Sequence, residues 1–155
     1  MKRIVTLALV GLLSAAGAAG AQAPAGPSSM EIVQARKAAM ALSGVATASM
    51  KASIDAGQSP RTQAFAAGSM ARWGQALPGM FPAGSGTADL AEGATNAKPE
   101  IWSDRSGFEA RAADYVAAAA RLQELARADD AAGFAAQWTV VRQTCQACHD
   151  AYKAG

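Results

Sequence analysis

The sequence predicts an all-α protein, an antiparallel bundle of four helices. Apolar residues recur at helical spacing in four stretches of the chain, and segments rich in glycine, proline or aspartate separate these stretches. No stretch shows the alternation that a half-buried strand requires, and the many alanines favour helix. Because two of the three connections are short, neighbouring helices are expected to run antiparallel.

The first helix is expected to begin near residue 31 and to continue to about residue 50. Ser28 or Ser29 is suited to cap its start, since a serine hydroxyl accepts from the free backbone N–H groups of a first turn. The residues expected on its inner face are Val33, Arg36, Lys37, Met40, Gly44 and Thr47. The segment 55–60, Asp-Ala-Gly-Gln-Ser-Pro, then breaks the helix.

The second helix is expected over residues 60–77, with Pro60 tolerated in its first turn. Its expected inner stripe is Phe65, Ser69, Trp73 and Leu77. The long segment 78–99 that follows is rich in glycine and proline and is expected to be irregular. Irregular segments of this length in a small domain usually serve function or span a large distance.

The third helix is expected to start near Ser103 or Asp104, and Asp129-Asp130 marks the turn into the fourth helix. The expected inner stripe of the third helix is Phe108, Ala112, Tyr115, Ala119, Leu122 and Leu125. The expected inner stripe of the fourth helix is Phe134, Trp138, Val141, Cys145, Cys148 and Tyr152.

The N-terminus has the pattern of a secretory signal. Lys2 and Arg3 precede a short apolar run, and small residues at 19–23 fit a cleavage site. We expect a signal peptide over 1–21, with an alternative end at 23, and one domain over 22–155. The protein is therefore expected in the periplasm, with no membrane span after cleavage.

The charge of the remaining chain is balanced. The chain has 14 basic and 12 acidic residues, and loss of Lys2 and Arg3 removes the excess of basic residues. Nucleic-acid binding normally requires a basic face, so no nucleic-acid partner is expected.

The most informative motif is Cys145-Gln146-Ala147-Cys148-His149, which contains both cysteines and the only histidine of the chain. C-x-x-C-H is the attachment pattern of c-type haem, in which two thiols form thioethers and the histidine binds iron. Spacings of three and four residues place all three side chains on one helical face. The inner stripes contain few large residues, and a buried planar cofactor would supply the missing apolar volume.

Other uses of the same residues are less consistent with the pattern. A Cys145–Cys148 disulfide would compete with haem for both sulfurs. A dithiol oxidoreductase places its two cysteines where a helix follows a strand, and no strand is expected here. A structural zinc site would need a fourth ligand, and the chain has no further cysteine or histidine to provide it.

Three segments give the chain its resemblance to the cytochrome c′ family, including the low-spin, methionine-ligated relatives. They are residues 145–153 (CQACHDAYK), 98–104 (KPEIWSD) and 36–40 (RKAAM). The resemblance implies a four-helix bundle with one haem c, attached through Cys145 and Cys148 near the C-terminal end of the fourth helix. It also implies that His149 is the proximal iron ligand.

The resemblance extends to residues around the cofactor. Arg36 is similar to a basic residue that lies beside the haem propionates in the family. Lys37 and Asn96 are similar to neighbouring haem-contacting positions. Lys153 is similar to a proximal basic residue that is often arginine in gas-binding members, and lysine lacks the planar fork of arginine.

The role of Met40 distinguishes between two functions. The resemblance places it over the distal face of the haem, where a thioether is a suitable sixth ligand. With His149 and Met40 as axial ligands, the protein is expected to be a one-electron carrier for redox partner proteins. With Met40 only packed against the ring, the alternative is a five-coordinate cytochrome c′ that binds nitric oxide or other gases.

An enzyme is not expected. The chain has no second histidine for acid–base chemistry, and the expected distal stripe offers only Met40 and small apolar neighbours. A monomer and a homodimer are both consistent with the sequence. Many members of the family pair through their first two helices, where Phe65 or Met50 is available to form the surface.

Overall fold

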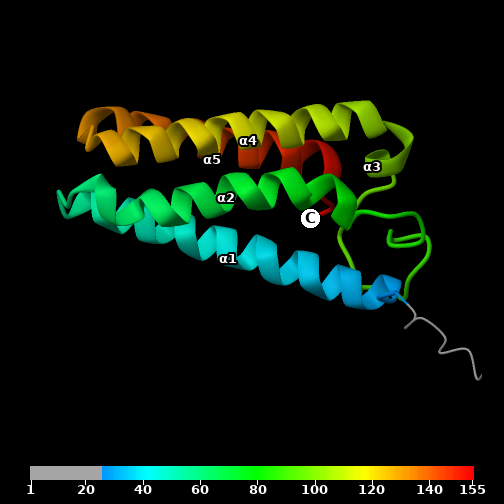
Figure 1. Cartoon of the computed structure of the whole chain (residues 1–155). Coiled ribbons are helices and arrows are strands. Elements are labelled where there is room, and N and C mark those ends of the chain that lie inside the picture. The colour runs from blue at the N-terminus through cyan, green and yellow to red at the C-terminus, as the bar shows by residue number, and fades with distance from the viewer. Residues whose placement is uncertain (1–25) are drawn as a thin grey trace, which may run out of the picture.

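Residues 26–155 are described by a computed structural model, and the expected signal peptide lies outside this range. The described chain contains four long helices, α1 (Ser29–Asp55), α2 (Ala64–Ala76), α4 (Arg105–Ala128) and α5 (Ala131–Tyr152). They run alternately up and down in one bundle, which confirms the predicted fold class (Figure 1). No helix in this part of the chain is long and apolar enough to cross a membrane.

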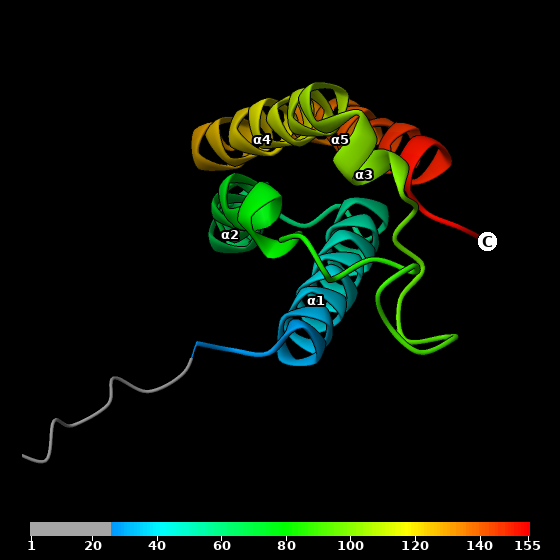
Figure 2. The ribbon, with the colours of Figure 1, turned by 90° about the vertical axis from the view of Figure 1, so that its right-hand side faces the viewer.

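Three short helices lie between the long ones. The 3₁₀ turns η1 (Pro60–Gln63) and η2 (Leu77–Met80) flank α2, and the single turn α3 (Glu100–Ser103) precedes α4. The bundle therefore has two different ends. The hairpin end carries the tight connections at 56–59 and 129–130, and the loop end carries segment 81–99 and the C-terminus (Figures 1 and 2).

Polar side chains fix the starts of three helices. Ser28 and Glu31 form a reciprocal capping box at α1, as the sequence predicted for a serine cap. Asp104 accepts from Gly107 N at α4, and Asp130 accepts from Gly133 N at α5. Each aspartate carboxylate also lies where the helix dipole is positive.

The helix α4 is the best-packed element of the bundle. It contacts both α2 and α5 along most of its length, and every residue predicted for its inner stripe is buried. A Cβ built at Gly74 of α2 would lie 2.8 Å from Tyr115 Cδ1 and 2.8 Å from Val116 Cγ2. A glycine is therefore required at this crossing for the two helices to approach so closely.

The stripe predicted for the second helix is confirmed at its C-terminal end, where Leu77 is buried and Trp73 packs against both core clusters, and is wrong at its N-terminal end. Phe65, expected on the inner face, is 80% exposed, and the buried residues are Ala67, Gly68, Met70, Ala71 and Gly74. The reason is the spacing of four residues, which overshoots a full turn by about 40° at each step, so that a stripe from 65 to 77 drifts around the helix and only its later members face the core. Met50, proposed as a surface residue, is completely buried.

Two clusters of buried residues share the interior. The larger cluster lies toward the hairpin end and includes Met50, Met70, Leu122 and Phe134. The smaller cluster lies at the loop end and is rich in aromatic residues, with Phe81, Phe108 and Tyr152 at its centre. The helix α1 diverges from α2 toward the loop end, which leaves space beside the second cluster (Figure 1).

Candidate haem-binding site

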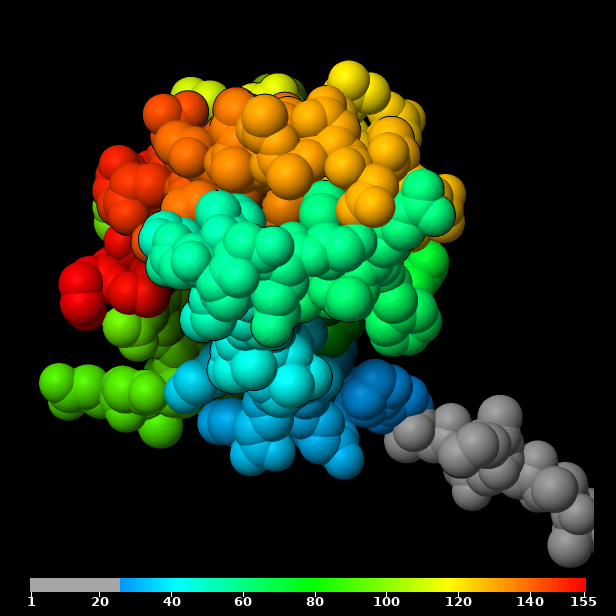
Figure 3. All heavy atoms as spheres, turned by 90° about the vertical axis from the view of Figure 1, so that its left-hand side faces the viewer, coloured from blue at the N-terminus to red at the C-terminus, as the bar shows by residue number. Residues whose placement is uncertain are grey.

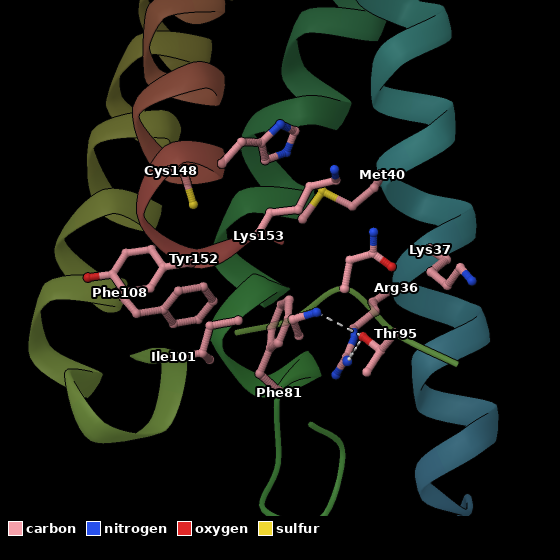
Figure 4. A pocket seen from close by; sticks show the side chains of 13 residues that line it. Arg36, Lys37, Met40, Phe81, Thr95, Ile101, Phe108, Cys148, Tyr152 and Lys153 are labelled. Atoms are coloured by element: carbon pink, nitrogen blue, oxygen red, sulfur yellow. Dashed lines mark hydrogen bonds between the residues drawn. The ribbon is translucent and has the colours of Figure 1, made fainter. Parts of the chain in front are cut away.

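A cavity of about 350 Å³ lies at the loop end, between α1, the last turns of α5 and segment 81–99 (Figure 4). It is lined by Arg36, Lys37, Met40, Phe81, Thr95, Asn96, Ala97, Ile101, Phe108, Cys148, His149, Tyr152 and Lys153. The cavity therefore brings together residues from the three segments that the sequence singled out. Its size falls within the usual range of small-molecule sites.

Cys148 and His149 enter the cavity from the C-terminal turns of α5. Burial raises the pKa of the Cys148 thiol, and the nearby Cys145 raises it further. Partial burial lowers the pKa of His149, and the charge of Lys153 acts in the same direction. A neutral imidazole has a free nitrogen lone pair, which is the form that binds metals.

Cys145 lies one helical turn deeper than Cys148, outside the lining of the cavity. It is half-buried against the larger core cluster, and burial raises the pKa of its thiol. No disulfide joins the two cysteines.

Met40 projects into the cavity from α1, and the thiol of Cys148 points into the same space from α5 (Figure 4). Met40 is half-buried and packs against the aromatic cluster of the loop end. His149 and Met40, which the sequence indicated as the proximal and distal residues, therefore line one cavity. The coordination of iron by Met40 remains a prediction.

Arg36 is buried to 3% exposure at the edge of the cavity, and segment 80–95 holds its guanidinium. Nη1 donates to Met80 O at 3.2 Å and to Ser85 Oγ at 2.8 Å. Nη2 donates to Ser85 O at 2.6 Å and to Thr95 Oγ1 at 2.8 Å. The guanidinium carbon also lies 4.3 Å from the centre of the Phe81 ring.

These contacts use four of the five guanidinium N–H groups. Arg36 thus ties the irregular segment to α1 and contributes its positive charge to the cavity wall. Sequence reasoning missed Ser85 and Thr95, because an irregular segment has no periodicity that would indicate which of its hydroxyls turn inward.

Lys37 and Lys153 are exposed at the mouth of the cavity, and their ammonium groups donate only to the backbone carbonyls of Ala94 and Ala154. Arg36, Lys37, Lys98 and Lys153 form no ion pair within residues 26–155. The charged side chains that line the cavity are therefore cations without carboxylate partners among the described residues.

Asn96 joins the irregular segment to the C-terminus. Its Nδ2 donates to Ala154 O and Gly155 O, and its backbone carbonyl accepts from Ala154 N at 2.8 Å. The next residue, Ala97, forms an antiparallel bridge with Lys153. This bridge fixes the chain four residues after His149.

An aromatic wall closes the cavity on its inner side. Phe108 makes edge-to-face contacts with Phe81 and Tyr152, at centroid distances of 5.0 and 5.4 Å. The Tyr152 hydroxyl donates to Asp104 Oδ2 at 2.8 Å, and this bond connects the last turn of α5 to the cap of α4.

The residues present fit a haem c group. The walls are apolar and aromatic, as a porphyrin requires, and a thiol and an imidazole project from one helix beside them. Arg36, Lys37 and Lys153 supply unpaired positive charge, which suits the two propionate carboxylates of haem. When bound, haem c would supply an iron centre that can exchange one electron or bind a small ligand.

The helical bundle and its C-x-x-C-H motif together define a c-type cytochrome of the four-helix class. The family model described as Cytochrome C′ matches residues 31–153. A cytochrome c′ of Rhodopseudomonas palustris is 32% identical over 127 residues, which cover 80% of this chain and 82% of the relative. The chain belongs to the cytochrome c′ family.

Other relatives match over shorter stretches. A cytochrome c′ of Rhodospirillum rubrum is 36% identical over 80 residues, covering 52% of each chain. The chain spans about half the length of this relative and of two further cytochromes c′ that it matches, with coverage of 46–60%.

Solved structures share the fold. A cytochrome c′ described as having an unusual ligand-controlled dimer dissociation has a TM-score of 0.76 at 24% identity, covering 84% of this chain and all of that one. A nitric oxide complex of a mutant cytochrome c prime from Alcaligenes xylosoxidans has a TM-score of 0.69 at 22% identity, covering 82% of this chain and 97% of that one.

Family membership establishes the cofactor. The protein is a monohaem c-type cytochrome, and haem c is attached covalently through its two cysteines, Cys145 and Cys148.

Proposed function

We propose that the protein is a five-coordinate cytochrome c′ of the periplasm, in which His149 binds the haem iron and the Met40 face receives a small gaseous ligand such as nitric oxide. The observation that carries the proposal is the apolar part of the cavity lining. Met40, Phe81, Ile101 and Phe108 line the cavity with apolar side chains, and none supplies a nitrogen or oxygen ligand to iron.

His149 is the single protein imidazole of the chain, so the chain has no second histidine to occupy the opposite position. The thioether of Met40 is a weaker ligand and lies on a flexible side chain, which an incoming diatomic can displace or pass. The nitric oxide complex of a protein with the same fold supports this choice of ligand.

The other residues around the cavity would hold the haem and shield it from water. Arg36, Lys37 and Lys153 would place positive charge near the propionates. Phe81, Phe108 and Tyr152 would exclude water from the inner edge. The bridge between Ala97 and Lys153 would keep His149 in a fixed orientation. None of these residues supplies acid–base chemistry on a substrate, so the proposed role is binding rather than catalysis.

A second function has one specific observation in its favour. Met40 lines the same cavity as Cys148 and His149 and projects into it from α1, whereas Cys148 and His149 belong to α5 (Figure 4). If its sulfur binds iron, the protein is a six-coordinate electron carrier with His/Met ligation, which raises the reduction potential.

Absorption spectra of the haem-loaded protein test the two functions against each other. The gas-binding function predicts a high-spin ferrous spectrum that changes on addition of carbon monoxide, in wild type and in Met40→Ala alike. A low-spin wild-type spectrum that resists carbon monoxide, together with a high-spin Met40→Ala variant, would reject it in favour of the carrier.

We also propose that two copies pair through α1 and α2. Leu42, Val45 and Phe65 are 68%, 65% and 80% exposed on these helices, and large exposed apolar side chains that gather on one region often mark interfaces. Light scattering of wild type and Phe65→Glu tests this. The proposal expects a dimer that dissociates in the variant, and a monomeric wild type would contradict it.

A further inference from the structure

The indole of Trp138, on α5, forms a hydrogen bond with the backbone of α1. Its Nε1 donates to Thr47 O at 2.9 Å. The ring packs against the larger core cluster, and Thr47 is buried. A backbone carbonyl has two lone pairs, so Thr47 O can accept this bond and still accept within its own helix. Within residues 26–155, no other hydrogen bond joins α1 to α5.

Trp138 lies on the face of α5 that carries the haem-attachment motif. Cys145 and His149 follow it by seven and eleven residues. At 3.6 residues per turn, both side chains return to within about 20° of the direction of Trp138. His149 is about 16 Å farther toward the loop end. The link to α1 therefore starts from the same stripe of α5 as the proximal residue.

The part of α1 that carries Met40 is held at both of its ends. Thr47, two turns beyond Met40, accepts the bond from α5. Arg36, one turn before Met40, donates to Ser85 and Thr95 of the irregular segment. Helical geometry places these three residues of α1 within about 40° of one direction, and α1 is uninterrupted between them. A movement of Met40 toward α5 therefore strains one of the two anchors or bends the helix.

The helix α1 has few other contacts that could fix its position. It is the least closely packed of the four long helices, and it diverges from α2 toward the loop end (Figure 1). A single hydrogen bond has a larger effect on the position of a helix where little packing restrains that helix. The two anchors of α1 therefore set the width of the cavity between α1 and α5.

We propose that Trp138 is a positioning residue for iron coordination, which acts through Thr47 to keep the Met40 sulfur from binding the iron. The sixth position would then stay open to a small gas. The inference rests on the proposed function and adds the reason why a thioether that lines the cavity is not a ligand. Because an approach of Met40 strains the anchors of α1, the conformation in which its sulfur binds iron is a minor state.

The test uses the full, haem-loaded protein with carbon monoxide as the probe. Trp138→Phe removes the N–H donor and keeps an aromatic ring in the core cluster. The matched control is Trp73→Phe, because Trp73 is also half-buried against that cluster but donates to no described residue. The double variant Trp138→Phe/Met40→Ala identifies the ligand. Ser85→Ala weakens the Arg36 anchor without a change of charge.

We expect Trp138→Phe to gain a low-spin fraction in its absorption spectrum, because the freed Met40 sulfur then reaches the iron in part of the molecules. Carbon monoxide has to displace that sulfur, so its affinity should fall about twofold to tenfold, the effect of one lost hydrogen bond. Trp73→Phe should match wild type in both measurements. Trp138→Phe/Met40→Ala should be high-spin, and Ser85→Ala should change in the same direction as Trp138→Phe.

Four results would overturn the inference. If Trp138→Phe matches wild type in spin state and affinity, the bond to Thr47 does not position Met40, while the gas-binding function stands. If the double variant keeps the low-spin fraction, the new ligand is not Met40. If Trp73→Phe changes equally, the effect is a general loosening of the core. A low-spin wild type that resists carbon monoxide would reject the proposed function as well. If Trp138→Phe does not fold, Ser85→Ala decides by the same criteria.

Discussion

The two ends of the bundle are stabilised in different ways. At the hairpin end, the turn before α2 bonds directly to the turn before α5. Ser59 Oγ donates to Asp129 Oδ1 at 2.6 Å, and Arg61 Nε lies 3.4 Å from Asp129 Oδ2. These two turns lie against each other on the surface of this end (Figure 3).

At the loop end, one irregular segment bridges α1 and α5. Arg36 holds its first part through Ser85 and Thr95, and Asn96 with Ala97 holds its last part to the C-terminus. Between these attachments lies the cavity, with cations that have no carboxylate partner in the described chain. The hairpin end therefore forms a complete core from the chain alone, whereas the loop end requires haem to complete its packing and its charge balance.

Removal of both attachment cysteines should give the largest difference between the ends. In Cys145→Ser/Cys148→Ser, no haem should remain bound to the polypeptide after denaturation, as mass spectrometry would show. Amide exchange should then accelerate at 81–99 and 145–152 far more than at 118–134, because only the loop end loses part of its core. An equal increase in amide exchange at both ends would refute the conclusion that only the loop end depends on haem for its packing.

A cavity at the hairpin end should destabilise the bundle regardless of haem. Phe134 is 1% exposed in the larger cluster, and Phe134→Ala is expected to lower the free energy of unfolding by about 3–5 kcal/mol. Denaturant unfolding of haem-loaded protein and of the double serine variant, each with and without Phe134→Ala, measures this. If the loss of unfolding free energy caused by Phe134→Ala differs with and without haem, the packing of the two ends is coupled.

Arginine substitutions at the two ends should differ in their cost. Arg36→Gln removes a buried charge and its hydrogen bonds, and should cost about 2–4 kcal/mol. Arg61→Gln at the hairpin end breaks an exposed pair and should cost less than about 1 kcal/mol. Denaturant unfolding compares them, and limited proteolysis should cut segment 81–99 only in the Arg36 variant. Similar costs would mean that Arg36 does not anchor the segment.

The smallest effect is expected at the capping box of α1. The hydrogen bonds that Glu31 accepts from Ser28 hold the pKa of its carboxyl below the ordinary 4.5. A depressed carboxyl pKa contributes stability that is present above pH 4.5 and is lost as the pH falls below it. Glu31→Gln keeps an acceptor for the cap and should flatten this part of the pH–stability profile. A profile identical to that of wild type would contradict this assignment.

Local rules were sufficient for most of the helices. Ser28, Asp104 and Asp130 cap the helices whose starts the sequence indicated, and every residue predicted for the inner stripe of α4 is buried. Each of these features depends on residues within one or two turns of each other. The stripe of the second helix was right at Trp73 and Leu77 and wrong at Phe65, because a spacing of four residues drifts around the helix.

The candidate site also has a local part, which the sequence predicted, and a long-range part, which it did not. The spacing of Cys145, Cys148 and His149 in the sequence identified the attachment motif, because it places three groups on one helical face. The sequence could not indicate that the Arg36 guanidinium donates to Ser85 and Thr95. It also could not indicate that the Asn96 side chain donates to the C-terminal backbone carbonyls. These contacts join residues 49 to 59 positions apart, across a segment without periodicity.

The sequence by itself determined that the chain forms four helices and carries covalent haem c on the last of them, since helical periodicity and thioether spacing are properties of neighbouring residues. Only the tertiary structure decided where the cavity opens and which cations surround it. Those properties depend on how far α1 diverges from the other helices, and the packing of the whole chain sets that divergence.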